Sequence, residues 1–312
     1  MGHKITTTIL TAFISLLCLN SPVFAYRIIN DNHFTSDSDG AKTQQHFIGY
    51  QQNLNNSNHN SSIKAQLGQI LVSTNNDSER LNALKLNTEH DISNSHLSLR
   101  LTPAWQSAWQ PVLAGATLSL SPYNDWYTEL FIDRELIDSV TGIRNKLLID
   151  TAGASIDYKI NPEFMAVGAY YNQLISDNNR RTGYLFRLIY TPETQTWFNI
   201  QSRSKLIDGK AQGTGYFSPL RLEEHWLITT LSTTIRNDAW AVKFQAGLGT
   251  QKVDQQENKS TLLAEIKLRG WQTDHFGLEA RAGYTNNGSF SSATSVNTYH
   301  YRYIDLSLIG NW

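Results

Sequence analysis

The stretch from Asn124 to Arg134 gathers acids and aromatic rings on one side of an expected strand, because side chains alternate between the two faces of a strand. One face carries Asp125, Tyr127, Glu129, Phe131 and Asp133, and the other carries Trp126, Thr128, Leu130 and Ile132. Carboxylates accept hydrogen bonds from hydroxyls or pair with amines, and rings stack on pyranose faces. This face therefore suits contact with a sugar polymer, or equally a charged pore lining in which the rings fill space.

A second stretch with candidate binding groups is the long loop expected over residues 207–222, IDGKAQGTGYFSPLRL. Its glycines and Pro219 allow sharp bends, and Tyr216 and Phe217 supply two rings. Such a loop can fold inward as a constriction or gate, or remain an ordinary surface loop.

The sequence contains no HExxH, GxSxG, P-loop or GxGxxG motif, and its nine histidines are scattered. His225 follows Glu223 and Glu224, but nearest neighbours on a strand point to opposite faces, which argues against a metal site there. A lumen or interface histidine is the plainer interpretation. We expect no enzymatic activity, no metal and no cofactor.

The first 25 residues predict a cleaved secretory signal peptide, with Lys4, an apolar run from Ile9 to Leu19 and a small-residue exit at Ala25. The apolar run is too short to span a membrane as a helix. Cys18, the only cysteine, lies inside this segment, so the mature chain is expected to have no thiol and no lipid anchor.

The charge balance gives no basic footprint for nucleic acid: 26 basic residues, of which Lys4 is lost with the signal peptide, face 27 acidic ones. Mean hydropathy is −0.38 and no later window approaches a spanning helix, which excludes a helical membrane protein. A transmembrane barrel is compatible with this polarity, because half of each spanning strand faces the lumen.

Alternating segments follow one another after residue 25, with no helical period and no linker, so residues 26–312 are expected to form a single domain. About sixteen strands are expected, an even number. They lie near 26–33, 44–54, 62–73, 81–91, 96–105, 111–121, 124–134, 147–160, 163–174, 182–191, 195–206, 223–235, 238–249, 258–270, 274–285 and 299–312.

Connection lengths separate a soluble sandwich from a barrel. On one side tight returns are expected at 93–95, 122–123, 161–162, 191–194, 236–237 and 271–273, with 55–61 as the exception. Longer returns are expected on the other side, at 34–43, 74–80, 106–110, 135–146, 176–181, 207–222, 250–257 and 286–298. A sandwich has no reason to keep its long loops at one end, so the pattern favours a transmembrane antiparallel up-and-down β-barrel.

The last stretch, 299–312, places Ile304, Leu306, Leu308 and Trp312 on one face and Tyr303, Asp305 and Ser307 on the other. An amphipathic strand that ends on an aromatic residue resembles the closing strand of bacterial outer-membrane barrels. Such a strand can also close a soluble sandwich.

Two short motifs carry a closer resemblance. FIDRELIDSVTGIRN, residues 131–145, and GTGYFSP, residues 213–219, are similar to elements in the C-terminal barrels of bacterial cellulose and poly-N-acetylglucosamine export proteins. The resemblance implies an outer-membrane conduit for exopolysaccharide, with Arg134, Asp138, Ser139, Tyr216, Phe217 and Pro219 as pore-lining or loop-fixing positions.

The chain departs from those exporters in one respect, because too few residues precede the second expected strand for even one tetratricopeptide repeat. Outer-membrane lipid, a polysaccharide substrate and separate periplasmic scaffold or synthase subunits are the expected partners. The alternatives are a general diffusion porin and, with less support, a barrel-shaped outer-membrane enzyme.

Overall fold

The computed structural model describes residues 26–54, 60–213, 215–235, 239–273, 275–287 and 299–311. The expected signal segment 1–25 and the terminal Trp312 lie outside the described residues. Within the described residues, no helix is long and apolar enough to cross a membrane.

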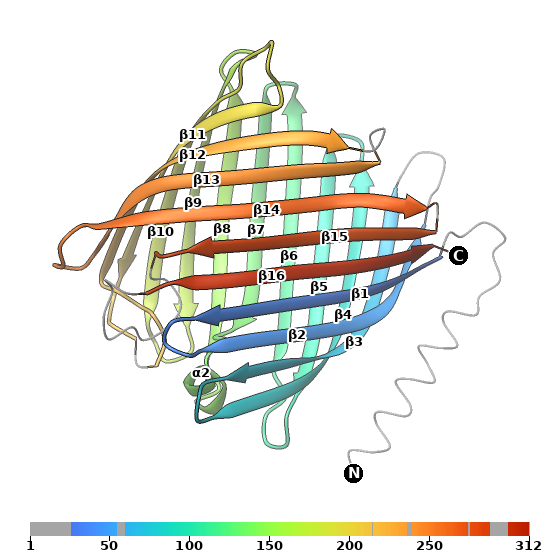
Figure 1. The fold of residues 1–312 in the computed structure, drawn as a ribbon. Helices are drawn as coiled ribbons and strands as arrows, with labels where there is room; N and C mark the ends of the chain where they lie inside the picture. The colour runs from blue at the N-terminus through green and yellow to red at the C-terminus, as the bar shows by residue number, and fades with distance from the viewer. Residues whose placement is uncertain are drawn as a thin grey trace.

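Sixteen strands and one short helix make up the described chain (Figure 1). The elements are β1 (Tyr26–Asp37), β2 (Lys42–Asn53), β3 (Ser61–Ser73), β4 (Ser78–Ile92), β5 (Ser95–Trp105), β6 (Val112–Tyr123), β7 (Trp126–Leu136), α2 (Val140–Arg144), β8 (Leu148–Lys159), β9 (Phe164–Ile175), β10 (Arg180–Tyr190), β11 (Phe198–Gly209), β12 (Arg221–Ile235), β13 (Trp240–Val253), β14 (Lys259–Thr273), β15 (Phe276–Thr285) and β16 (Tyr301–Asn311).

The strands close into one antiparallel barrel in which each strand pairs with its neighbours in the chain and β1 pairs with β16. The closing register runs from Arg27 opposite Asn311 to Asp37 opposite Tyr301, so β1 is bonded along its length on both sides. The expected all-β barrel of about sixteen strands is confirmed. Closure leaves no unpaired strand edge, which is the condition for a sheet to cross a lipid bilayer.

Strands on the loop side run further than the sequence indicated, so several connections there are tight turns. Residues 38–41, 74–77 and 176–179 join their strands where longer loops were expected. Pairing on both sides extends β1 to Asp37 although its sequence alternates poorly, because ladder hydrogen bonds override a weak local pattern. The connections 137–147 and 210–220 lie at the barrel end opposite Tyr26 and Asn311, and the last residue of β15 and the first of β16 lie at that same end.

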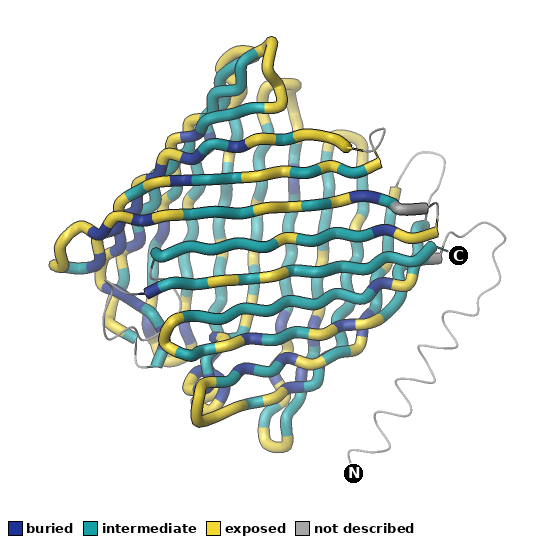
Figure 2. The backbone as a smooth tube through the Cα atoms, in the orientation of Figure 1, coloured by how far each residue is buried: buried dark blue, intermediate teal, exposed yellow. Residues whose placement is uncertain are grey.

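The outer face of the barrel is apolar. Ile132, Leu227 and Leu248 are each at least 60% exposed, and exposed residues recur along many of the strands in Figure 2. In water such a surface would aggregate, whereas in lipid it is the required contact surface.

Aromatic pairs mark the end of the barrel that carries the termini. Trp126 lies 4.8 Å from Tyr158, and Phe164 lies 4.8 Å from Tyr190, measured between ring centroids. Each of these residues is at or next to the end of its strand. This is the position of an aromatic girdle at a membrane surface.

Helix α2 lies inside the barrel at the loop end. Its Val140 and Ile143 are buried against a cluster from the inner faces of β2 to β5 that includes Phe47, Val72 and Leu81. The sequence predicts a plain loop here, because a five-residue helix has too few residues to show a helical period. The connection 137–147 is therefore a folded plug against one wall of the mouth.

Candidate functional site: the lumen wall and the barrel mouth

The acidic and aromatic face expected on β7 lies on the inner wall. Glu129 is opposite Ser119 and Asp133 is opposite Gly115 on β6. The Tyr127 hydroxyl lies 2.9 Å from Ser119 Oγ and 3.0 Å from Glu129 Oε2. The ring is thereby held beside the carboxylate.

A hollow of about 380 Å³ opens in front of this wall, between β5, β6 and β7. It is lined by Ser98, Arg100, Thr117, Glu129, Phe131 and Asp133. Arg100 Nη2 pairs with Asp133 and lies 3.3 Å from Glu135 Oε1. The hollow thus presents Glu129, whose partner is the Tyr127 hydroxyl, together with the Arg100–Asp133 ion pair and the Phe131 ring.

Two glycines make this arrangement fit. A Cβ on Gly153 of β8 would come within 2.5 Å of Phe131 Cζ, so the ring lies directly over the bare backbone of that residue. A Cβ on Gly115 would come within 3.0 Å of Asp133 Oδ1. Gly115 and Gly153, on the two strands that flank β7, are therefore part of the site.

Two of the expected site residues lie elsewhere. Arg134 does not line the lumen, because it is on the opposite face of β7 from Asp133 and makes a bidentate ion pair of 2.6 and 2.7 Å with Asp150. Both side chains are about half exposed on the outer face near the mouth. Asp125 lies in the turn between β6 and β7, at the end of the barrel and outside the row of acids.

The two motif segments meet at the mouth. Ser139 is the N-cap of α2, where its Oγ accepts a hydrogen bond of 2.9 Å from Gly142 N. The same hydroxyl donates a hydrogen bond of 2.9 Å to the carbonyl of Gly215. Gly215 has φ +82°, and a Cβ there would come within 2.3 Å of Thr141 Cγ2. Only glycine satisfies both the backbone angle and the close approach.

Tyr216 fixes the loop 210–220 rather than lining the pore. It is 3% exposed and packs with Ile137, Leu147 and Ile175. Its hydroxyl donates to Asp177 Oδ2 at 2.7 Å and accepts from Asn179 Nδ2 at 3.0 Å. Burial together with the Asp177 carboxylate raises the pKa of Tyr216 to about 12.

The remaining motif residues are also at the mouth. Phe217 packs against the cluster of Ile207, Leu222 and Val253, and Pro219 is buried with its carbonyl against Gly209. Asp138, just before α2, has an exposed side chain. The motif residues therefore act mainly in loop fixing, and the pore-lining interpretation of Tyr216 and Pro219 is wrong because both are buried.

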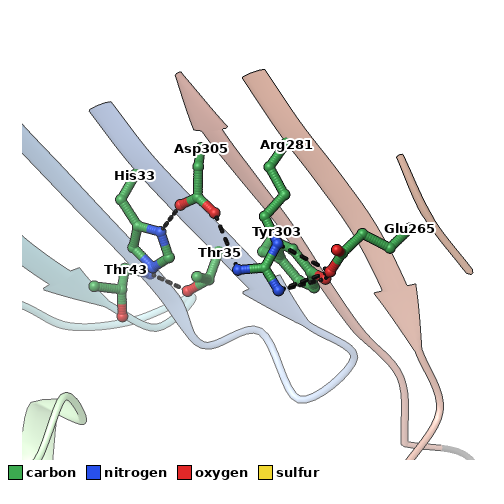
Figure 3. A network of polar contacts seen from close by, with 7 residues as sticks. All are labelled: His33, Thr35, Thr43, Glu265, Arg281, Tyr303 and Asp305. Carbon is green, nitrogen blue, oxygen red and sulfur yellow. Dashed lines mark hydrogen bonds and ion pairs between the residues drawn. The ribbon is translucent and has the colours of Figure 1, made fainter. Parts of the chain in front are cut away.

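Sequence reasoning missed a polar network on the lumen side of the closing strands (Figure 3). His33 Nδ1 of β1 contacts Asp305 Oδ1 of β16, and Arg281 Nη1 lies 3.8 Å from the second oxygen of Asp305. Arg281 Nη2 also pairs with Glu265 at 2.7 Å, and Tyr303 contacts the same carboxylate. The polar face of residues 299–312 indicated two members of this network, Tyr303 and Asp305. Their partners come from β1, β14 and β15.

His225 lies on the outer face of β12, where its Nδ1 is 3.0 Å from Ser204 Oγ on β11. The sequence suggested a lumen or an interface position for His225, and the structure excludes the lumen. In the described part of the chain, no three His, Cys, Asp or Glu side chains form a cluster able to hold a metal.

Closed antiparallel topology, an apolar outer face, an aromatic girdle and a polar interior together define an outer-membrane β-barrel. No protein-family profile matches the chain, and no curated protein matches it. Solved structures do resemble it. A structure described as a bacterial polysaccharide outer membrane secretin aligns with 12% identity and a TM-score of 0.67, covering 93% of this chain and 98% of the other.

Other similar structures include OccK11 (OpdR) of Pseudomonas aeruginosa, with 9% identity, a TM-score of 0.47 and coverage of 92% and 95%. OmpT, an outer membrane protein of Vibrio cholerae, aligns with 8% identity, a TM-score of 0.45 and coverage of 94% and 100%. The similarity to the secretin supports the barrel fold.

Proposed function

We propose that this barrel is a passive conduit for exopolysaccharide across the outer membrane, of the poly-N-acetylglucosamine or cellulose class. The observation that carries the proposal is the hollow in front of β7, where Glu129, Phe131 and the Arg100 and Asp133 pair face one space. A ring and a carboxylate on the same wall contact both the apolar face and the polar edge of a sugar.

The mouth supports a conduit that is held at a set width. Helix α2 and the loop 210–220 are bonded to each other and to the barrel wall at Ser139 and Tyr216. The resemblance of their two motifs to exporter barrels, and the 0.67 TM-score to a polysaccharide secretin, point in the same direction. Partner subunits that supply polymer from the periplasm belong to this proposal.

A general diffusion porin uses the same barrel but needs no sugar-binding wall, and the two functions separate in one experiment. The test variant is Glu129→Gln, because Glu129 has no ion pair among the described residues whose loss would disturb its neighbours. The control is Glu279→Gln, which makes the same charge change on β15, in the wall that lines a different hollow, and which also removes the 2.7 Å ion pair of Glu279 with Arg269.

Both variants are expected to lower cation selectivity in planar bilayers, because each removes one negative charge from the lumen. Only Glu129→Gln is expected to reduce secreted polysaccharide in a strain that depends on this barrel. Unchanged secretion in both variants, together with shifted ion selectivity, would leave the general pore and remove the export function.

A further inference from the structure

A hollow of about 650 Å³ lies on the outside of the barrel, over β8 to β11. We call it the outer groove. Its floor is formed by Ala154 and Gly168 with Ile156, and its walls by the rings of Tyr170, Tyr184 and Phe186. The three rings are 44%, 46% and 54% exposed, which places them on the lipid-facing surface.

The floor is open because its residues are small. A Cβ on Gly168 would meet only one neighbouring atom within 4 Å, Ile156 Cγ2 at 3.9 Å. In contrast, a Cβ on Gly153 of the neighbouring strand, which faces inward, would come within 2.5 Å of Phe131. In a bilayer an open apolar hollow is filled by acyl chain, because an unfilled gap loses dispersion contacts on every lining atom.

One end of the outer groove is polar. Ser204 Oγ and His225 Nδ1 lie 3.0 Å apart, and Arg221 Nε donates to Glu223 Oε1 at 2.6 Å. All four residues line the same hollow. Arg221 is the first residue of β12 at the mouth, and its side chain is 58% exposed. The polar groups therefore lie toward the outer leaflet surface.

A continuous row of paired residues joins the two ends. Thr128 is opposite Ile156, which is opposite Gly168, then Phe186, Ser204 and His225 across six neighbouring strands. The row starts near the terminus end of β7 and finishes near the mouth end of β12. Along this row Ile156, Gly168 and Phe186 are followed by Ser204 and His225, so the groove becomes polar toward the mouth end of β12.

We propose that the outer groove binds one lipid of the outer leaflet, with an acyl chain over Ala154 and Gly168 and a phosphate headgroup at Arg221 and His225. Arginine has five N–H donors, of which Glu223 takes the Nε–H, and phosphate is a strong partner for the guanidinium group. A second copy of this barrel would need no polar end of this kind at the level of the headgroups.

The test fills the groove and removes its charge in separate variants of the full barrel. Gly168→Leu places a side chain on the open floor, where its Cβ would have its nearest neighbour at 3.9 Å, and Arg221→Gln removes the cation. The controls are Ala264→Leu and Arg302→Gln, which introduce a leucine and remove an arginine on the outer faces of β14 and β16, away from the groove. Faster migration of unheated than boiled protein on gels verifies that each variant has folded.

Delipidated barrel is mixed with micelles that contain dioleoyl phosphatidylglycerol or uncharged dioleoylglycerol, and bound lipid is counted by native mass spectrometry. Wild type and both controls are expected to retain one phosphatidylglycerol. Gly168→Leu is expected to lower retention of both lipids about tenfold, and Arg221→Gln to lower only that of phosphatidylglycerol. Equal retention in Gly168→Leu and Ala264→Leu, no retained lipid in wild type, or a dimer that Gly168→Leu dissociates would each overturn the proposal.

Discussion

The Ser139 hydroxyl donates a hydrogen bond to the carbonyl of Gly215, 76 residues further along the chain, at 2.9 Å. The same oxygen accepts from Gly142 N, so one side chain both caps helix α2 and attaches it to the loop 210–220. Two segments that the sequence offers as separate motifs are therefore one structural unit at the mouth of the barrel.

Ser139→Ala is expected to free the loop from the helix and to cost about 1 kcal/mol at the helix N-terminus. Single barrels in planar bilayers should then show a larger and noisier conductance, with an unchanged stability of the barrel in urea. Ser139→Asp separates the two roles, because a carboxylate caps the helix but cannot donate to Gly215. If the Asp variant behaves like wild type, the bond to Gly215 does not hold the mouth.

Arg144 holds α2 to the turn 74–77 by a bidentate pair with Asp77, at 2.7 Å to each oxygen, and by Nε to Glu79 at 2.7 Å. These bonds lower the pKa of Asp77 below its usual 3.8. A lowered pKa means that the pair is complete above pH 3.8 and is lost as the pH falls through the depressed value. Conductance is therefore expected to be constant from pH 8 to 5 and to rise only in stronger acid.

Arg144→Gln is expected to give the high conductance at every pH, because the acid-sensitive pair is absent. The control is Arg80→Gln, next to Glu79 in sequence but exposed. If conductance still rises in strong acid in Arg144→Gln, another group causes that rise.

Tyr216→Phe keeps the ring in its apolar cluster but removes the hydroxyl that donates to Asp177 and accepts from Asn179. Loss of both bonds is expected to weaken loop docking by about 1–3 kcal/mol, because a partly buried carboxylate loses its donor. Trypsin should then cleave after Lys210 faster than in wild type. The control Tyr170→Phe, on the outer face, should leave the rate of this cleavage unchanged.

The raised pKa of Tyr216 gives a second readout. The neutral phenol is the form that binds Asp177, so its contribution is complete below the usual value near pH 10 and is lost as the pH rises through about 12. Wild-type conductance should rise in this window, and Tyr216→Phe should show no such step.

Gly153→Ala is expected to destabilise the barrel by about 1–3 kcal/mol and to displace Phe131, since the added Cβ would lie 2.5 Å from the ring and 2.6 Å from the Tyr170 carbonyl oxygen. The matched control is Gly168→Ala on the next strand, where the added carbon has its nearest neighbour at 3.9 Å. Urea unfolding should separate the two variants. Similar midpoints would contradict the close packing of Phe131 on β8.

The alternation of residues along the chain was sufficient to predict the barrel. In β7, Glu129 and Asp133 alternate with Leu130 and Ile132, and this period of two assigns the inner and outer faces without any knowledge of tertiary contacts. The same period gave the polar face of β16 with Tyr303 and Asp305. The period therefore assigns Glu129 and Asp133 to the inner face, whereas Asp125 lies in the preceding turn, and contact of these acids with sugar stays a prediction.

Arg134 lies on the opposite face of β7 from these acids. It follows Asp133 directly and so belongs to the outer face, but the motif resemblance placed it among pore-lining candidates. Its partner Asp150 lies on β8 in the next strand of the barrel, and only strand register brings the two together.

The contents of the lumen depended on tertiary structure, because they are held by contacts between residues that no periodicity relates. Helix α2 is buried by side chains of β2 to β5, and Tyr216 is held by a turn between β9 and β10. The polar network on the lumen side of the closing strands joins His33 to Asp305 and Arg281 only after the barrel closes. Local pattern fixes which face a side chain occupies, whereas closure and register decide which other side chains it meets there.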